Sequence, residues 1–336
     1  MEKAKGFKLF LGMSFGAVVV MVIGFIQLTS KKHVKPMVQN TFAESISAKA
    51  CWICPKETTM PKSNMELIKY GRELIKNTSL YLGPKGSIAH LSNGMNCQNC
   101  HLEAGTKAWG NNYFGVASTY PKFRERSGTI ETIEKRVNDC LERSLNGKPL
   151  QKNSKEMKSI VAYMEWLGTG VEKGVKPEGT GITDLEYLGV AASPEKGRLV
   201  YETKCQSCHT NTGVGILNMD GKGYQYPPVW GSHSFNTGAS LYQLSRLAGF
   251  VKNNMPHGAT YKNPLLTDEE AWHVAAYIVS MDRPVKETPK DWPNVMAKPI
   301  DHPFGPYTDG FTETQHKYGP FGPIKKANEA LKKTSS

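Results

Sequence analysis

The sequence predicts a mainly α-helical protein in which two similar domains follow one another, after an N-terminal membrane helix and before an extended C-terminal tail. Three observations predict this fold class: a short cysteine–histidine motif that occurs twice, helical patterns that recur in the same order around each copy, and one long apolar run near the N-terminus. The 336 residues leave room for two ordinary domains. A hydrophobic content of 39% can fill their cores, which excludes a wholly disordered chain.

The apolar run extends from Leu9 to Leu28 and comes after three lysines. A helix of that length, rising about 1.5 Å per residue, covers about 30 Å, the thickness of a bilayer core. The run ends in Thr-Ser-Lys-Lys, a poor cleavage site, so we interpret residues 1–30 as an uncleaved anchor. A cleaved signal peptide is the alternative. In both cases the chain would be exported, and we expect it in the periplasm, either anchored to the inner membrane or released.

The formal charge of +12 indicates an acidic partner, an anionic substrate or a membrane surface. No stripe of lysines and arginines interleaved with aromatic residues is present. We therefore expect no nucleic-acid partner.

Two copies of Cys-x-x-Cys-His begin at Cys97 and Cys205, 108 residues apart. A helical pattern with a Gly-Arg pair precedes each copy, at Gly71 and at Gly197, and a second helical pattern with aromatic residues comes after each copy. Glycine facing an aromatic side chain lets two helices cross closely. Two unrelated helical domains are the alternative, but they would not repeat these features in the same order.

The predicted organisation comprises six segments. They are an anchor over 1–30, a juxtamembrane linker with a Cys-x-x-Cys over 31–61, domain 1 over 62–170, a linker over 171–190, domain 2 over 191–284 and a tail over 285–336. In the tail we expect extended chain, with no helix before Lys325–Lys333.

The motif itself points to a cofactor. Two thiols at this spacing can form thioether bonds to one haem, whose iron the adjacent histidine then ligates. A zinc site or a disulfide is the alternative for a lone Cys-x-x-Cys. Two copies that each continue into histidine, in a chain expected to be exported, favour haem over that alternative. We therefore expect two covalently bound haems c, each with an iron: one held by Cys97, Cys100 and His101, the other by Cys205, Cys208 and His209.

Each haem iron needs a sixth ligand or an open position. In domain 2, Met255 precedes a proline and lies 46 residues after His209, a usual place for a distal methionine. Domain 1 has no comparable Met-Pro, but Cys140 lies 39 residues after His101. The alternative for a single cysteine is a buried, inert thiol.

The neighbours of Cys140 favour a functional role. We expect a helix from Thr129 to Ser144, on which Arg136, Cys140 and Ser144 share one face, with Arg126 just ahead of it. Guanidinium groups beside a thiol favour the thiolate, which is both a nucleophile and an iron ligand. They also bind oxyanions through paired hydrogen bonds. The alternative is that one of the arginines pairs with haem propionates.

With these residues in place, the chain resembles the thiosulfate dehydrogenase family of dihaem cytochromes c, over about residues 62–324. The resemblance rests on both haem motifs, on Arg136-Val-Asn-Asp-Cys140-Leu-Glu-Arg-Ser144-Leu-Asn-Gly147, on Asn254-Met255, and on the tail segments Asp301-His-Pro-Phe-Gly-Pro-Tyr307 and Gln315-His-Lys-Tyr-Gly-Pro-Phe321. It implies two class I cytochrome c domains in tandem.

The resemblance also implies an activity and roles for the site residues. The activity is the joining of two thiosulfates into tetrathionate, and often the reverse reduction. His101 and Cys140 would ligate the catalytic haem iron, and His209 and Met255 the iron of the electron-relay haem. Arg126, Arg136 and Ser144 would hold the sulfur oxyanions. Some relatives use a lysine as an exchanging ligand where this chain has Asn254, and asparagine cannot take that role.

A redox partner is implied as well, such as a small cytochrome c or a membrane quinol-linked donor. The alternative function is a non-catalytic, membrane-anchored dihaem electron carrier. Cys140 with its arginines argues against it, because a carrier needs no substrate-binding face. Cys51 and Cys54 lack an adjacent histidine, so we interpret them as a local disulfide or as a redox or docking element near the membrane.

Overall fold

The computed structural model describes residues 53–334. The predicted anchor over 1–30 and Cys51 lie outside the described residues. Within the described part of the chain, no helix is both long enough and apolar enough to cross a bilayer.

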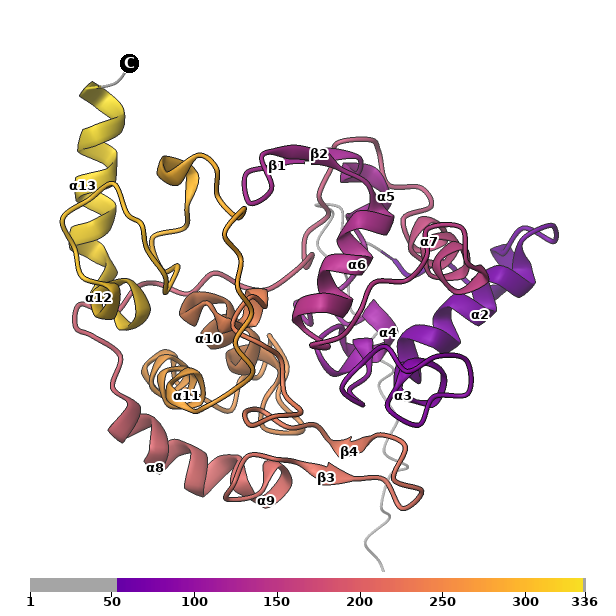
Figure 1. Cartoon of the computed structure of the whole chain (residues 1–336), viewed down its shortest axis with the longest axis horizontal. Coiled ribbons are helices and arrows are strands. Elements are labelled where there is room, and N and C mark those ends of the chain that lie inside the picture. Colours follow the sequence, from indigo (N-terminus) through magenta and orange to yellow (C-terminus); the bar gives the residue numbers. More distant parts are fainter. Residues whose placement is uncertain (1–52, 335–336) are drawn as a thin grey trace, which may run out of the picture. The chain divides into compact units, whose positions relative to one another are not determined.

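The described chain is mainly helical, with two short two-stranded sheets (Figure 1). A short 3-10 helix, η1 (Glu57–Thr59), precedes domain 1. The elements of domain 1 are, in chain order, α2 (Met65–Lys76), α3 (Thr78–Leu82), η2 (Cys97–Asn99), α4 (Leu102–Gly105), α5 (Val116–Thr119), β1 (Lys122–Arg124), β2 (Thr129–Glu131), α6 (Ile133–Arg143) and α7 (Lys155–Leu167). Those of domain 2 are α8 (Pro194–Lys204), α9 (Gln206–His209), β3 (Ile216–Leu217), β4 (Tyr224–Tyr226), η3 (Ser240–Tyr242), α10 (Leu244–Asn254) and α11 (Asp268–Ser280).

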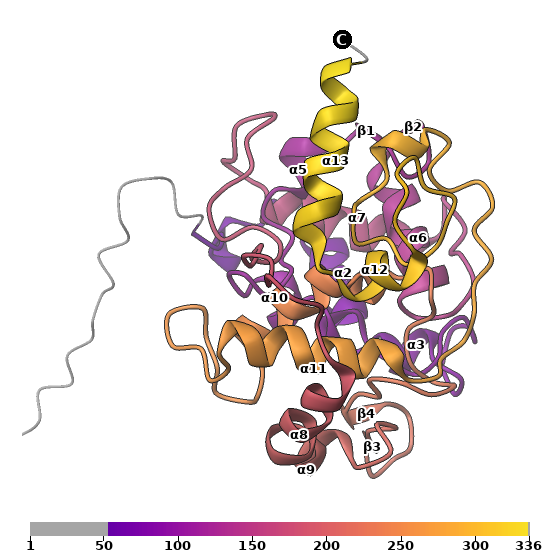
Figure 2. The same cartoon turned by 90° about the vertical axis from the view of Figure 1, so that its left-hand side faces the viewer.

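The same helix crossing occurs in both domains. In domain 1, α2 packs on α7, and a Cβ on Gly71 would lie 1.9 Å from the carbonyl oxygen of Ser159. In domain 2, α8 packs on α11, and a Cβ on Gly197 would lie 1.8 Å from the carbonyl oxygen of His273 (Figure 2). No side chain fits at either position, so each crossing requires glycine. The prediction that the glycines allow close crossings is confirmed.

The prediction of one helix from Thr129 to Ser144 is wrong at its start. Residues Thr129–Glu131 form β2, which pairs antiparallel with β1. The helix α6 begins at Ile133, because the Thr132 side chain accepts a hydrogen bond from the Lys135 amide and caps it. The hairpin that precedes α6 brings Arg126, in its turn, alongside the tail.

A second difference from the prediction lies in the tail. It contains η4 (Val295–Ala297), α12 (Glu313–Tyr318) and α13 (Phe321–Thr334), so helices form before Lys325. The helix α12 was missed because its N-terminal cap, Thr312, comes after a run of glycine and proline that suggested extended chain. A buried histidine, His316, stabilises it by bonding to the Ile300 carbonyl and the Asp309 carboxylate.

The tail packs on both domains. Phe321 and Ile324 belong to the buried core of domain 2. On the domain 1 side, the Trp292 amide donates to the Arg126 carbonyl at 2.7 Å, and Arg143 pairs with Asp291 through two hydrogen bonds of 2.7 and 2.8 Å. Figures 1 and 2 both show the segment after α11 running beside β1 and β2.

The two domains also contact each other directly. Tyr224 in the β3–β4 hairpin packs against the core of domain 1. The Asn236 amide donates to the carbonyl of Arg143, at the end of α6, and its side chain donates to the Glu142 carbonyl at 2.8 Å. These contacts hold the end of α6 against domain 2.

Candidate functional site

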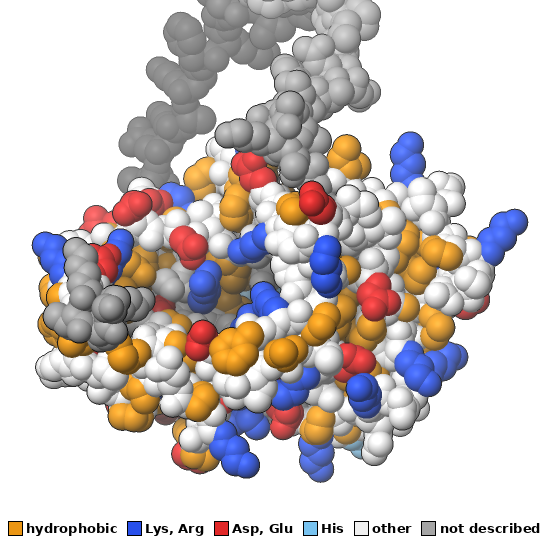
Figure 3. Space-filling view, turned by 90° about the horizontal axis from the view of Figure 1, so that it is seen from above, with side chains coloured by type: hydrophobic (Ala, Val, Ile, Leu, Met, Phe, Trp, Pro, Cys, Tyr) orange, Lys and Arg blue, Asp and Glu red, His pale blue; other side chains and the backbone are white. Residues whose placement is uncertain are grey.

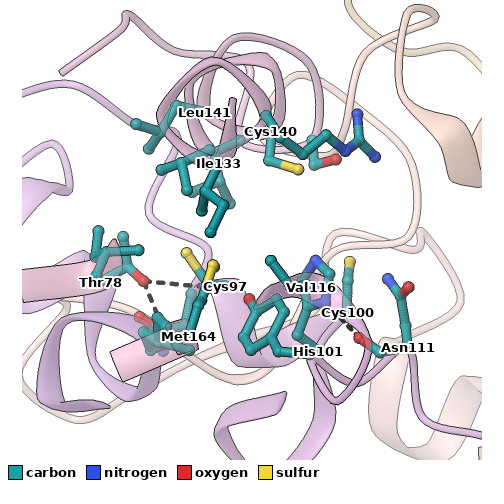
Figure 4. Close-up of a pocket in the computed structure, with 18 of the residues that line it drawn as sticks. Thr78, Cys97, Cys100, His101, Asn111, Val116, Ile133, Cys140, Leu141 and Met164 are labelled. Atoms are coloured by element: carbon teal, nitrogen blue, oxygen red, sulfur yellow. Dashed lines mark hydrogen bonds between the residues drawn. The ribbon is translucent and has the colours of Figure 1, made fainter. Parts of the chain in front are cut away.

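A cavity in domain 1 contains most of the predicted catalytic residues. It encloses about 990 Å³ of space free of protein atoms, part of it open to solvent. Cys97, Cys100 and His101 line one side. Cys140 lies on the other side, on α6, and its sulfur points into the cavity (Figure 4).

The His101 ring is held in one orientation. Its Nδ1 donates to the Asn111 carbonyl, 2.5 Å away, and the ring stacks on Tyr113 with 4.5 Å between centroids. Backbone amides of the haem loop in turn donate to the 171–190 linker, including that of Asn111 to the Gly181 carbonyl. Burial lowers the pKa of His101 to about 4, so its imidazole is neutral. The Nε2 lone pair is therefore free for a metal.

The first cysteine of the motif is fixed to the preceding helices. The Cys97 amide donates to the Thr78 hydroxyl at 3.0 Å, and that hydroxyl donates to the Leu74 carbonyl. The Asn96 side chain accepts from the Ser79 amide at 2.8 Å. The motif is thus attached to the junction between α2 and α3.

The opposite wall is formed by α6. Its buried apolar residues, Ile133, Val137 and Leu141, anchor the helix in the core of domain 1. Arg136, Cys140 and Ser144, which recur every four residues, all line the cavity. The negative charge of a Cys140 thiolate raises the pKa of Arg136 above its ordinary value. The structure therefore brings these three predicted residues together.

Arg126 does not line this cavity. It lines a second, smaller cavity between domain 1, domain 2 and the tail. Its Nη2 donates to the Ser240 hydroxyl at 3.3 Å, and its guanidinium lies 5.8 Å from the centre of the Trp292 ring. Burial, together with the charges of Arg136 and Arg143, lowers the pKa of Arg126 to about 10. The charge of Arg136, which lines the first cavity, thus acts on Arg126 in the second.

In domain 2 the second motif repeats the arrangement of the first. The Nδ1 of His209 donates to the Pro227 carbonyl at 2.8 Å, which leaves Nε2 free, and burial lowers the pKa of this histidine. Cys205 and Met255 both pack against the core of this domain. Met255 is the first residue after α10. Its role as the sixth ligand stays a prediction.

The residues present fit two haems c. In each domain two free thiols and a neutral imidazole, oriented by a carbonyl, stand together. In domain 1 they face a cavity of the size of a cofactor site with a further sulfur across it. A c-type haem uses this donor set: two thioether attachments, one imidazole and one sulfur ligand.

The chain is similar to known proteins in both domains. Residues 88–172 match the family described as SoxA/TsdA, cytochrome c domain, and residues 194–282 match the family described as cytochrome c. It is 36% identical over 253 residues to a thiosulfate dehydrogenase of Psychrobacter arcticus, covering 75% of this chain and 74% of that protein. It is 37% identical over 228 residues to a thiosulfate dehydrogenase of Allochromatium vinosum, covering 67% of this chain and 81% of that protein.

The chain belongs to the thiosulfate dehydrogenase family. It is a family of enzymes, and the two cytochrome c domains carry two covalently bound c-type haems with iron. A solved structure, thiosulfate dehydrogenase (TsdBA) from Marichromatium purpuratum in its as-isolated form, matches with a TM-score of 0.63 at 28% identity. The match covers 69% of this chain and about half (49%) of that longer chain.

Several site residues carry no sequence signal of their own. Asn111 and Pro227 act through backbone carbonyls, which any residue supplies. Gln243, which lines the second cavity beside Arg126, is isolated in the sequence from every motif. Gln243 comes to lie beside the Arg126 cavity only because domain 2 and the tail pack against the turn before α6.

Proposed function

We propose that this protein joins two thiosulfate ions into tetrathionate, with the release of two electrons, and that it catalyses the reverse reduction. One observation carries the proposal: Cys140 faces His101 across the domain 1 cavity, with Arg136 and Ser144 on the same helix face. A plain electron carrier, the alternative, has no need for a cation, a hydroxyl and a thiol that line one accessible cavity.

The charges of the site suit the substrate. Thiosulfate is a dianion, so joining two of them brings like charges together. The Arg136 guanidinium offsets this repulsion, and the Ser144 hydroxyl can donate to a sulfonate oxygen. Figure 3 shows Lys and Arg side chains gathered around a hollow on the face seen from above, which supports the approach of an anion.

Cys140 can hold one thiosulfate covalently, so that the reaction takes two balanced steps. In the first, its thiolate forms an S–S bond with the outer sulfur of one thiosulfate, giving Cys140-S-S-SO₃⁻ and releasing two electrons. In the second, another thiosulfate attacks the sulfur attached to the sulfonate. The bond to Cys140 breaks, tetrathionate leaves and the thiolate is restored. The reverse reduction runs through the same two steps.

The two haems, when bound, accept these electrons, and we propose that the second exchanges them with an external partner. The packing of the chain supports a route between the domains. Cys100 of the first haem motif and Leu102, the residue after that motif, pack against the core of domain 2. The Asn254 side chain, next to Met255, donates to the Trp109 carbonyl in the haem loop of domain 1 at 3.1 Å.

We further propose that the protein works in the periplasm, held at the inner membrane by residues 1–30. Its redox partner would be a small cytochrome c or a quinol-linked donor in that membrane. The basis is the apolar run in the sequence and the site of haem c attachment, which lies outside the cytoplasm.

A steady-state assay with the purified dihaem protein tests the function. With thiosulfate and an artificial electron acceptor, we expect one tetrathionate for every two electrons transferred. With tetrathionate and a reduced donor, we expect two thiosulfates for each tetrathionate consumed. Electron exchange with a donor and acceptor but no change in either sulfur compound would instead establish the electron carrier.

A further inference from the structure

The cavity beside Arg126 is a second candidate site. About 290 Å³ of space, part of it open to solvent, lies between the turn before α6, the η3 region of domain 2 and the tail. Arg126 comes from the first of these, Gln243 from the second, and Asp291 and His302 from the third. The tail therefore closes a pocket that neither domain forms alone.

Two hydrogen-bond donors in this pocket lack an acceptor. Arg126 Nη1 and Gln243 Nε2 are buried and have no hydrogen-bond partner. Both side chains line the cavity, and both residues are only 8% exposed. An unsatisfied buried donor costs stability, so two such donors that line one cavity indicate that something else supplies the acceptor.

The local charge points to an anion as that acceptor. The Asp291 carboxylate is already paired with Arg143 at 2.7 and 2.8 Å, so these two charges cancel. Burial lowers the pKa of His302 to about 4, which leaves this histidine neutral. Arg126 therefore remains as a buried cation. Burial and the charge of Arg136 disfavour its charged form, while the charges of Arg143 and Asp291 act on it in opposite directions.

We propose that this pocket is an oxyanion subsite in which Arg126 Nη1 and Gln243 Nε2 donate to the oxygens of one anionic group. The inference rests on the proposed function. Tetrathionate has a sulfonate at each end, and Arg136 with Ser144 can hold only the one beside Cys140. A carboxylate of the domain 1 haem offers the same chemistry. The experiment distinguishes these two sources.

The test uses the oxidised, full-length dihaem protein. All binding measurements are made in a Cys140→Ser background, because the Cys140 thiolate would attack tetrathionate and release thiosulfate even without added electrons. Titration calorimetry at fixed ionic strength then measures binding alone. Gln243→Met removes the donor at nearly constant length, and Gln243→Glu keeps the shape but adds a negative charge. Gln151→Met, at an exposed position, is the matched control. The midpoint potentials of both haems are measured in all four proteins.

If the pocket holds a sulfonate, Gln243→Met raises the Kd for tetrathionate about tenfold, Gln243→Glu raises it further, and the potentials stay unchanged. If it holds a haem carboxylate, the Kd stays unchanged and one haem potential shifts in both variants. The control changes neither quantity.

Unchanged Kd and unchanged potentials in both Gln243 variants would overturn the subsite. Because Gln243→Glu retains the native shape, it remains informative where Gln243→Met fails to fold. The proposed function fails separately, if the wild-type protein converts neither thiosulfate nor tetrathionate.

Discussion

Replacing Arg126 by methionine is expected to stabilise the protein while it weakens catalysis. The pKa of Arg126 is lowered from the ordinary 12.5 to about 10, first by burial and then by neighbouring cations. That difference corresponds to about 3 kcal/mol of cost in the folded state. At pH 7, below both pKa values, arginine is protonated whether folded or unfolded, so the whole cost applies.

The substitution also removes favourable contacts. The hydrogen bond from Arg126 to the Ser240 hydroxyl, 3.3 Å long, contributes about 1 kcal/mol. The cation–π contact with Trp292, at 5.8 Å, contributes about 0.5 kcal/mol. The net expectation is a gain of about 1–2 kcal/mol, which corresponds to a rise in Tm of roughly 1–3 °C for a protein of 336 residues.

Thermal unfolding of the oxidised protein, without added anions, measures this gain. Arg198→Met, which removes a surface ion pair with Glu202, is the control, and we expect its Tm to stay nearly unchanged. In the same Arg126→Met variant, kcat/KM should fall about 30- to 1000-fold, because about 2–4 kcal/mol of transition-state binding is lost. A fall in Tm of several degrees would refute the reasoning. It would show that the resting protein already supplies Arg126 with an anionic partner, such as a haem propionate.

Other predictions concern the helix crossings and the second haem. Gly71→Ala and Gly197→Ala should each destabilise the protein by about 1–3 kcal/mol, because the added Cβ would lie within 2 Å of a facing carbonyl oxygen; Gly189→Ala, where nothing lies within 4 Å, should have little effect on thermal unfolding. Met255→Gly should abolish the methionine–iron charge-transfer absorption of the oxidised protein and lower the potential of the second haem, as spectroelectrochemistry would show. If that absorption is already missing from the wild type, a different residue is the sixth ligand.

The sequence was informative where a local pattern determines a local structure. The two Cys-x-x-Cys-His motifs and the glycines of the helix crossings are recognised from residues a few positions apart, and the structure shows both crossings as expected. The spacing of Arg136, Cys140 and Ser144 likewise predicted one helix face, which lines the domain 1 cavity.

The predictions from sequence were wrong where contacts between residues far apart in the chain determine the structure. Thr129–Glu131 shares a helical periodicity with the residues of α6, but pairing with Lys122–Arg124 makes it a strand. Helix α12 depends on the burial of His316 against the tail's own backbone. The position of Arg126 in a separate cavity depends on the tail segment around Trp292, more than 160 residues further along the chain. No pattern in the sequence connects the two.

The central claim is that Cys140 makes the domain 1 haem site catalytic, and one variant tests it most directly. The Cys140→Ser protein should retain both covalently attached haems, as measured by haem content per chain. Its turnover should fall at least a thousandfold in both directions. It should also lose the spectroscopic signature of a thiolate-ligated haem. A Cys140→Ser protein that converts thiosulfate to tetrathionate at the wild-type rate would contradict the account.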